Sequence, residues 1–394
     1  MSLDGPVDWD TQFDHFDPRY AADPQTVWRD LRERGVIARG ERFRGMWVPV
    51  SHADVSTVAE HPELFSSRSP LIADFGAMAD FGITAPPISS DPPYHTGVRR
   101  MLLPFFGPKR IEALRPGIEA HADGLIDAFA GGAGCDAALD YARHIPVRVI
   151  ATMLGVPLSD EDRFFGWVHQ LLELAPLSIE EGAIGLFDFF DYFHGQLNER
   201  REERRDDLMS FLLDADIDGR VLETDEILGI CLLLLLAGID TTWSSIGAGI
   251  WHFAQHPEQR ARLAAEPELW PSAIEELLRC YAPVTMAREV AVDTDVLGCP
   301  MHAGDPLLLP FPSANRDPAV FPDPDEVILD RGENRHLAFG LGIHRCLGSN
   351  LARLEVGVAV RRFLERVPDF SLDGDVTWSV GQVRGPRTLP LRFG

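Results

Sequence analysis

A segment of ten residues, Phe339 to Gly348, constrains the fold of this chain more than any other part of it. It reads Phe-Gly-Leu-Gly-Ile-His-Arg-Cys-Leu-Gly, so Gly340 and Gly342 precede a lone cysteine, Cys346. Glycines adopt the positive φ angles of a tight turn without a steric penalty, and such a turn crowds backbone amides around the sulfur. The apolar pattern from Leu351 to Val360 predicts a helix, which places the thiol just before a helix N-terminus, where its pKa is lowered. The segment therefore predicts a thiolate that binds a metal ion such as iron.

The spacing Phe-Gly-x-Gly-x-His-x-Cys-x-Gly resembles the heme-binding loop of the cytochromes P-450, in which the cysteine thiolate is the axial ligand of the heme iron. The alternative, a structural cysteine in a glycine-rich turn, requires six fixed positions to match by accident. The resemblance implies heme b as the cofactor and Cys346 as the iron ligand, with Phe339, Gly340, His344 and Gly348 as heme contacts.

The charge and the cysteines exclude several classes of protein. The formal net charge is -25, from 61 acidic and 36 basic residues, which argues against nucleic acid or an anionic membrane as a partner because both require a basic surface. The five cysteines form no C-x-x-C pair, and the first residues lack the basic and apolar regions of a signal peptide. We therefore expect a cytoplasmic protein without structural disulfides.

Helical periodicity covers most of the chain. It is strongest from Glu226 to His256 and extends, with short breaks, from Ile111 to Arg205. The apolar run from Ile227 to Ile239 is too short to cross a membrane and predicts a core helix. The charged run from Asn198 to Asp207 predicts a solvated helix end.

The length alone would allow two or three domains, but no candidate linker divides the chain. The resemblance runs from about residue 20 to the C-terminus. It implies a mainly α, single-domain cytochrome P-450 fold, a helix-rich prism with a small β-rich region. We expect this heme domain to comprise residues 1–394, with residues 1–20 as an N-terminal extension.

The predicted central helix changes character at Ala237-Gly238-Ile239-Asp240-Thr241-Thr242. Its small residues would let a ligand approach the backbone, and burying a carboxylate and a hydroxyl costs free energy unless both are hydrogen-bonded or used. The simplest alternatives are a Thr241 hydroxyl bonded to the Ala237 carbonyl and an Asp240 carboxylate paired with an arginine. The segment resembles the distal motif of the cytochromes P-450, which implies that Asp240 and Thr241 supply protons during oxygen activation and that Ala237 and Gly238 contact the heme.

Two pairs of charged or polar residues lie at helical spacing. His95 and Arg99 are four residues apart on one helix face, a spacing that fits a solvated surface equally well. The resemblance implies that both bind a heme propionate, together with Arg288 and His344. Glu276 and Arg279, three residues apart, resemble the family's buried structural brace beside the heme loop, for which Arg331 is the candidate third member.

The segment from Phe65 to Pro93 combines glycines and prolines with many large apolar residues, which suggests a loop that covers an apolar ligand. The candidates for a substrate pocket come from this loop, a predicted helix pair and two later turns: Leu71, Phe75, Phe81, Leu174, Val284, Met286 and Val383. Because they are all apolar, they predict a hydrophobic small molecule as substrate.

The resemblance implies a heme-thiolate monooxygenase that inserts one oxygen atom from O₂ into this molecule, by hydroxylation or O-dealkylation. About fifty residues follow Cys346, too few for a reductase domain, so we expect a monomer that receives electrons from a separate ferredoxin and ferredoxin reductase. A basic patch could dock the ferredoxin, with scattered surface cations as the alternative: Arg99, Arg100, Lys109, Arg110 and Arg345. A peroxide-driven enzyme of the same fold is the closest rival, and a non-catalytic heme sensor would need neither Asp240 nor Thr241.

Overall fold

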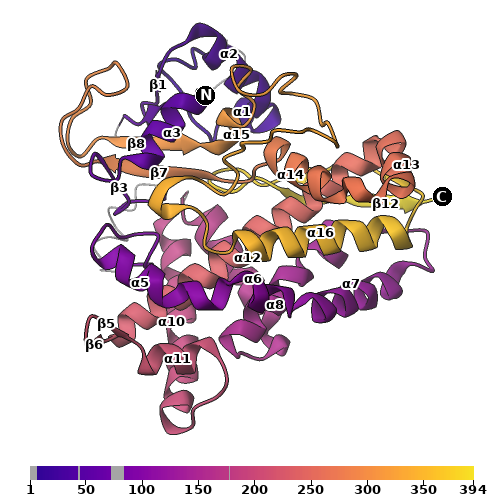
Figure 1. Cartoon of the computed structure of the whole chain (residues 1–394), viewed down its shortest axis with the longest axis horizontal. Helices are drawn as coiled ribbons and strands as arrows, with labels where there is room; N and C mark the ends of the chain where they lie inside the picture. Colours follow the sequence, from indigo (N-terminus) through magenta and orange to yellow (C-terminus); the bar gives the residue numbers. More distant parts are fainter. Residues whose placement is uncertain (1–6, 43–44, 72–83, 177) are drawn as a thin grey trace.

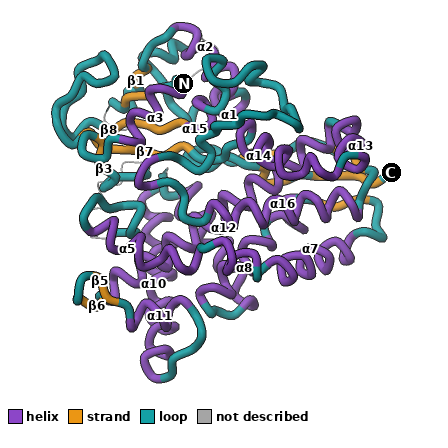
Figure 2. The backbone as a smooth tube through the Cα atoms, viewed as in Figure 1, coloured by secondary structure: helices purple, strands orange, loops and turns teal. Residues whose placement is uncertain are grey.

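The computed structural model of the chain describes residues 7–42, 45–71, 84–176 and 178–394. Helices make up most of it, and the longest strands gather in one region next to the N-terminal helices (Figures 1 and 2). The observed fold is therefore mainly α, as the periodicity predicts.

The α-helices of the described residues are α1 Pro18–Ala22, α2 Pro24–Arg34, α3 His52–Glu60, α5 Tyr94–Leu102, α6 Pro108–Glu112, α7 Arg115–Phe129, α8 His144–Leu154, α9 Glu161–Val168, α10 Ile179–Glu202, α11 Leu208–Asp214, α12 Thr224–Gln255, α13 Pro257–Ala265, α14 Trp270–Cys280, α15 Phe311–Ala314 and α16 Ser349–Arg366. Shorter helical turns of the 3₁₀ or π type are η1 Leu103–Phe106, η2 Ala138–Ala142, η3 Leu158–Asp160, η4 His169–Leu174, η5 Pro267–Leu269 and η6 Gly342–His344. The strands are β1 Ala38–Arg39, β2 Trp47–Val48, β3 Phe65–Ser66, β4 Gly134–Asp136, β5 Asp216–Ile217, β6 Arg220–Val221, β7 Thr285–Val290, β8 Pro306–Pro310, β9 Phe370–Leu372, β10 Thr377–Trp378, β11 Pro386–Thr388 and β12 Pro390–Phe393.

Helix α12 runs through the centre of the helical region and packs against α8, α9, α10, α14 and α16 (Figure 1). Its N-terminus is fixed by a reciprocal capping box between Glu223 and Glu226. Within the described part of the chain, α12 is the only helix long and apolar enough to cross a membrane, but 72% of its most apolar window is buried inside the protein. A helix that is apolar on all faces thus belongs to the core of this protein.

The β-rich region is built on a five-stranded sheet in the order β1-β2-β8-β7-β3. Its main pair is antiparallel, with Thr285 opposite Pro310 and Glu289 opposite Pro306. A separate apolar cluster packs the N-terminal helices onto this sheet, and its members include Phe13 and Trp28, which are 1% and 0% exposed. The described part of the predicted N-terminal extension, residues 7–20, is therefore packed onto the body of the protein.

The hairpin β10–β11 brings the end of the chain onto α12. Its turn approaches the helix so closely that a Cβ atom on Gly385 would lie 2.2 Å from the Cβ of Ser244. A glycine is required at this contact, because any side chain would displace the turn. The contact fixes β11, and with it Arg387, beside the middle of α12.

The prediction of a solvated helix end for residues 198–207 is wrong for two residues. The side chains of Arg200 and Asp207 are 0% and 4% exposed, and Arg200 Nε lies 2.7 Å from Asp207 Oδ2. Arg200 also donates to the carbonyl oxygen of Gly155, at 2.6 Å. The chain turns back after α10, so charges that look like a surface run in the sequence face each other inside the fold.

Candidate active site

The cysteine loop has the backbone that its glycines predict. Gly340 and Gly342 have φ angles of 66° and 68°, and a Cβ atom on Gly342 would lie 2.2 Å from the carbonyl oxygen of Ala59. The Cys346 N–H donates to the Phe339 carbonyl oxygen at 2.8 Å, which closes the loop. Helix α16 begins at Ser349, so the thiol does precede a helix N-terminus.

The Cys346 side chain is accessible to solvent, yet surrounding protein atoms desolvate it. This desolvation raises the pKa of the Cys346 thiol, against the opposing effects of the Gly348 backbone and the guanidinium groups of Arg99 and Arg345. The prediction of a lowered thiol pKa is therefore wrong for the protein without heme, because burial outweighs the Gly348 amide and the nearby guanidinium groups. Coordination to a metal ion such as iron would deprotonate this thiol outright.

Two histidines from distant parts of the chain meet beside this loop. The ring centroids of His95, on α5, and His344, on η6, lie 4.3 Å apart. Nε2 of His344 is buried without a hydrogen-bond partner among the described residues, and the buried His95 ring has at most a weak bond to the backbone of Ile343. Burial lowers the pKa of both rings, that of His344 to about 3. Unpaired buried donors of this kind call for a polar ligand.

Two arginines complete the same group. Arg288, on β7, is 6% exposed, and its guanidinium donates to the Ala287 carbonyl but forms no ion pair within the described part of the chain. Burial lowers its pKa to about 10. Arg99 donates from Nη2 to the Arg345 carbonyl oxygen at 2.5 Å, which joins α5 to the cysteine loop. The structure thus brings together all four residues predicted to bind heme propionates.

These residues fit a heme. Cys346 offers a sulfur ligand, and Arg288, Arg99 and the histidine pair offer cations and hydrogen-bond donors to acidic substituents. A buried cation without an ion-pair partner is costly unless an anion neutralises it. Heme b, a metal complex that carries two carboxylates, meets these requirements.

Thr241 and Ala237 form the accessible stretch of α12. Ala237 is exposed and Thr241 half-buried, whereas Ile239 and Asp240 are 0% exposed. The Thr241 hydroxyl donates to the Ala237 carbonyl oxygen at 2.7 Å. This is the hydrogen bond that the sequence predicts as the alternative to a role in proton supply. A side-chain bond to the i−4 carbonyl of this kind slightly destabilises a helix and favours a bend, although α12 stays helical through Thr241.

Asp240 is buried and lies next to Arg387 of β11. Arg387 Nη2 is 2.7 Å from Asp240 Oδ1, and Arg387 Nε donates to Glu173 Oε1 at 2.5 Å. Burial raises the pKa of Asp240 to about 6, although the Arg387 guanidinium acts to lower it. The guanidinium also stacks on Trp243, with Cζ 4.4 Å from the ring centroid. An acid that ionises near neutral pH is suited to hold or release a proton.

Gly238 has a packing role that the sequence does not indicate. A Cβ atom at this position would lie 2.4 Å from Cδ1 of Ile150, on α8. The missing side chain thus allows α12 and α8 to approach each other, while the predicted heme contact of Gly238 stays a prediction.

The brace is present as a buried network. Arg279 donates from Nε and Nη2 to the Glu276 carboxylate at 2.8 Å, and both residues are 0% exposed. Arg331 Nε lies 3.0 Å from both Glu276 oxygens, and Asn334 Nδ2 donates to the same carboxylate at 3.1 Å. Arg279 further donates to the carbonyl oxygens of three loop residues: Asn315, Pro324 and Glu326. The network fastens α14 to the segment that leads into the cysteine loop.

Comparisons with known proteins agree with this geometry. The family model described as Cytochrome P450 matches residues 184–373. The chain is 38% identical over 313 residues to the mycinamicin IV hydroxylase/epoxidase of Micromonospora griseorubida, with 77% of this chain and 79% of that protein covered. It is 35% identical over 394 residues to the vitamin D(3) 25-hydroxylase of Pseudonocardia autotrophica, with 97% of each chain covered. The chain belongs to the cytochrome P-450 family.

The fold agrees as well. A crystal structure of a myxobacterial cytochrome P-450 in complex with myristic acid superposes with a TM-score of 0.89 at 34% identity and covers 96% of this chain and 98% of that one. Cytochromes P-450 bind heme b, and the relatives include hydroxylases and monooxygenases. This cytochrome P-450 is accordingly a heme-dependent monooxygenase.

The predicted substrate residues are partly brought together. Val284 and Val383 pair in an isolated antiparallel bridge, and the Met286 sulfur accepts a hydrogen bond from Gln382 Nε2 at 3.2 Å. The Ala287 N–H donates to the Pro70 carbonyl oxygen at 3.0 Å, which places half-buried Leu71 close to the strand that carries Met286. Leu174 lies on η4, one residue after Glu173. Phe75 and Phe81 lie outside the described residues.

Sequence reasoning missed Arg387 and Glu173. A buried Asp240 requires a cation, and the sequence supports that much, but 36 basic residues compete for the role. The partner is selected by the hairpin turn at Gly385, which sets β11 on α12. Arg387 can be identified as the partner only once the contact between Gly385 and α12 is known.

Proposed function

We propose that this cytochrome P-450 hydroxylates an apolar small molecule with O₂ and with electrons from a separate ferredoxin, in the cytoplasm and as a monomer. The observation that carries this proposal is the arrangement of Asp240 and Thr241, an acid and an alcohol next to each other on α12 with only Thr241 accessible. A heme protein that merely senses a ligand needs no such pair.

The heme, when bound through Cys346, supplies the redox chemistry of oxygen activation. The chain supplies the protons. Thr241 Oγ1 is the accessible group, and its hydrogen bond to the Ala237 carbonyl fixes the direction of the hydroxyl. The Asp240 carboxyl is the second proton donor, next to Thr241 in the helix. Burial raises its pKa to about 6, so it can hold a proton near neutral pH.

Arg387 fixes the position of the Asp240 carboxylate. It forms an ion pair with Asp240 and a charged hydrogen bond with Glu173 at the same time. Glu173 lies on η4, which packs against α10 and also carries the predicted pocket residue Leu174. One guanidinium thus connects the carboxylate of Asp240 to η4, so a movement of η4 would alter the electrostatic environment of the acid.

The apolar wall formed by Val284, Val383 and Met286 supports a hydrophobic substrate. Relatives and solved structures carry names that refer to a steroid, vitamin D(3), testosterone and myristic acid. These compounds share a large apolar surface, which favours burial in such a wall.

A spectral binding screen tests the substrate class. Steroids, fatty acids, terpenoids and aromatic acids are added to the ferric holoenzyme, and the expected result is a shift of the Soret band by at least one apolar class. Val284→Asp, which places a charge in the wall, should abolish the shift, whereas Val221→Asp, on the 63% exposed side chain of a surface strand, should not. The absence of a shift with every class would favour a heme sensor over a monooxygenase of apolar molecules.

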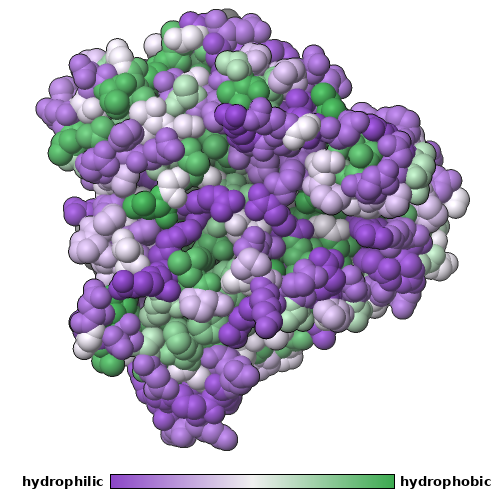
Figure 3. Space-filling model, in the orientation of Figure 1, coloured by the Kyte–Doolittle hydropathy of each residue, from purple (hydrophilic) through white to green (hydrophobic). Residues whose placement is uncertain are grey.

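The electron donor is expected to dock at the side of the cysteine loop. Arg99 and Arg345 lie together there, and Arg100, Lys109 and Arg110 follow on α5 and α6. This face, viewed in Figure 3, carries many hydrophilic residues between the β-rich region and the lower helices. In a protein with a net charge of -25, a local basic group would attract an acidic ferredoxin.

The rate of heme reduction by a bacterial ferredoxin, measured at increasing ionic strength, tests this docking. The rate should fall steeply with salt, because exposed charges are screened within about 8 Å at physiological ionic strength. A rate independent of salt would favour scattered surface cations. Turnover with peroxide but none with any ferredoxin would instead reveal a peroxide-driven enzyme.

A further inference from the structure

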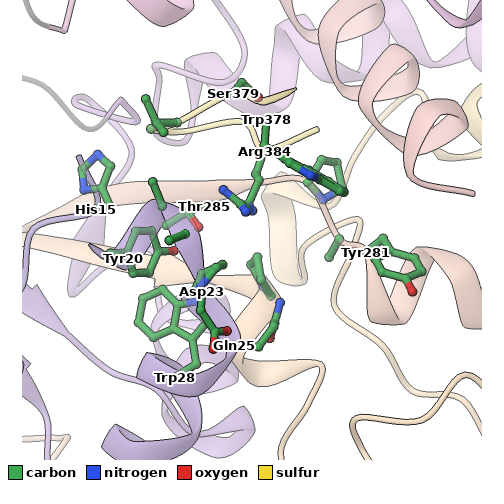
Figure 4. A pocket seen from close by; sticks show the side chains of 18 of the residues that line it. His15, Tyr20, Asp23, Gln25, Trp28, Tyr281, Thr285, Trp378, Ser379 and Arg384 are labelled. Carbon is green, nitrogen blue, oxygen red and sulfur yellow. The ribbon is translucent and has the colours of Figure 1, made fainter. Parts of the chain in front are cut away.

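A cavity lies on the far side of the wall formed by Val284, Val383 and Met286. Its volume is about 610 Å³, within the range that holds small organic ligands. It is enclosed by α1 and α2, by the end of α14 and the start of β7, and by the loop that joins β10 to β11 (Figure 4).

The wall between this cavity and the predicted substrate pocket has two faces. Side chains alternate along an extended chain, and the two extended segments here are joined by a hydrogen bond of 2.8 Å from the Arg384 N–H to the Pro283 carbonyl oxygen. Thr285 and Arg384 line the cavity, whereas none of the predicted pocket residues of these segments, Val284, Met286 and Val383, does. The cavity is thus distinct from the site already described.

Arg384 directs a free charge into the cavity. Its guanidinium extends into the open space in Figure 4, with Cζ 5.1 Å from the Trp378 ring. Within the described part of the chain, this guanidinium makes no ion pair and no hydrogen bond. The other lining arginine, Arg316, already uses both terminal nitrogens, because Nη1 pairs with Asp325 at 2.9 Å and Nη2 donates to the Cys280 carbonyl at 2.9 Å. Among the described residues, only its buried Nε lacks a partner.

Asp23 lies on the opposite side of the cavity from Arg384 (Figure 4). Its carboxylate accepts the Thr26 N–H at 3.2 Å and so caps the N-terminus of α2. It forms no ion pair with Arg384. The space between them is therefore available to a ligand, and Asp23 weakens the attraction that Arg384 exerts on an anion.

Aromatic rings shape the rest of the cavity. Tyr20 and Trp28 pack edge to face with centroids 5.4 Å apart, and Trp28 is 0% exposed. On another side, Trp251 contacts both Trp378 and Tyr281, at 5.1 and 5.7 Å between centroids. These rings are held by their neighbours, so the lining is preorganised for a flat apolar body.

We propose that this cavity is a second small-molecule site, separate from the heme pocket, which binds an organic monocarboxylate with an aromatic body. The carboxylate pairs with Arg384, whose planar fork matches two carboxylate oxygens. The aromatic body lies among Tyr20, Trp378 and Tyr281, with the buried Trp28 ring packed behind Tyr20.

Isothermal titration calorimetry of the holoenzyme tests the proposal. The probes are 1-naphthylacetate and its neutral amide, 1-naphthylacetamide, each titrated with and without a saturating azole that occupies the heme pocket. We expect one molecule of the acid to bind, roughly 10-fold or more tightly than the amide, with an affinity that the azole leaves unchanged. Equal affinities, absence of binding, or displacement by the azole would each overturn the proposal.

Three variants identify the residues. Arg384→Gln should weaken binding of the acid roughly 10-fold or more and leave the amide unaffected, and Arg335→Gln, which removes the same charge from a side chain that is 75% exposed, should change neither. Asp23→Asn keeps the helix cap, since asparagine caps as well as aspartate, and should tighten binding of the acid. Loss of affinity in Asp23→Asn, or no loss in a folded Arg384→Gln, would overturn the proposal. If Arg384→Gln does not fold, Asp23→Asn and the acid–amide comparison decide.

Discussion

Arg387 Nη2 lies 2.7 Å from Asp240 Oδ1 inside the protein, so the only buried acid of the distal motif is held by a residue 147 positions further along the chain. The pair is asymmetric, because Arg387 also binds Glu173 whereas Asp240 has no second cation within the described residues. Against the burial that raises the pKa of Asp240, one guanidinium, that of Arg387, therefore acts to lower it.

Arg387→Gln should shift the pH dependence of catalysis. Without the guanidinium, burial acts unopposed and raises the pKa of Asp240 above its present value of about 6, by about 1–3 units. The amount of product per electron consumed, followed from pH 5 to 9, should change at a correspondingly higher pH. Arg387→Lys retains a positive charge and should shift the pH profile less. If the wild type and both variants have the same pH profile, Asp240 does not supply the protons.

Asp240→Asn should alter the dependence of stability on pH. Because the pKa of Asp240 is higher in the folded protein than in the unfolded chain, the folded state keeps this proton as pH rises from about 4 to 6, while the unfolded chain loses it. The wild type therefore loses about 3 kcal/mol across this window through Asp240. The asparagine variant does not titrate there, so its melting temperature should rise relative to the wild type from pH 4 to 6 and then keep a constant difference. A difference that is independent of pH would contradict the raised pKa.

Glu276→Gln should destabilise the fold strongly. It leaves the buried guanidinium of Arg279 and the adjacent Arg331 without a counter-charge, at a cost of about 3–5 kcal/mol. Glu365→Gln breaks two solvent-accessible pairs, with Arg361 and Arg362, whose side chains are 51% and 32% exposed, and should cost about 1 kcal/mol or less. The midpoints of guanidinium chloride unfolding, followed by circular dichroism and heme absorbance, compare the two. Equal midpoints would show that the brace contributes no more than a surface pair.

Arg288→Met should have opposite effects on the protein with and without heme. In the apoprotein it removes a buried cation that has no ion-pair partner among the described residues, so the apoprotein should gain stability. In the holoprotein it removes a partner of the heme carboxylates, so heme should transfer to apomyoglobin about 10-fold faster. An unchanged transfer rate would remove Arg288 from the heme site.

The sequence predicts the parts of this site that depend on local chemistry. Gly340 and Gly342 predict the turn, and the periodicity from Glu226 to His256 predicts α12 almost to its ends. The predictions that were wrong concern burial. The Arg200–Asp207 pair and the pKa of Cys346 depend on which distant segments pack around them, and a charge pattern alone contains no information about that packing.

The same reason explains why the partner of Asp240 could not be predicted. The distal motif shows that an acid is buried, but the cation comes from a strand whose position depends on one glycine, Gly385, meeting Ser244. Contacts within a helix, such as that of Thr241 with Ala237, can be anticipated from spacing. Contacts between the central helix and the end of the chain require the fold.

Thr241→Ala should separate heme binding from proton delivery. The Thr241 side chain is half-buried on the accessible stretch of α12, and its hydroxyl is bonded only to the Ala237 carbonyl of its own helix. Its removal should therefore leave the heme spectrum and the thermal stability close to those of the wild type. Protons would then no longer be supplied in step with electrons, so a larger share of the reducing equivalents should appear as hydrogen peroxide, with a loss of product of about 10-fold.

Two further substitutions distinguish the hydroxyl from the shape of the side chain. Thr241→Ser retains the hydroxyl and should keep most of the coupling, whereas Thr241→Val retains the shape without the hydroxyl and should behave like Thr241→Ala. The ratio of peroxide to product, measured at saturating substrate and equal ferredoxin, orders the variants. If Val and Ser couple equally well, Thr241 acts through packing, and proton delivery must be assigned to another group.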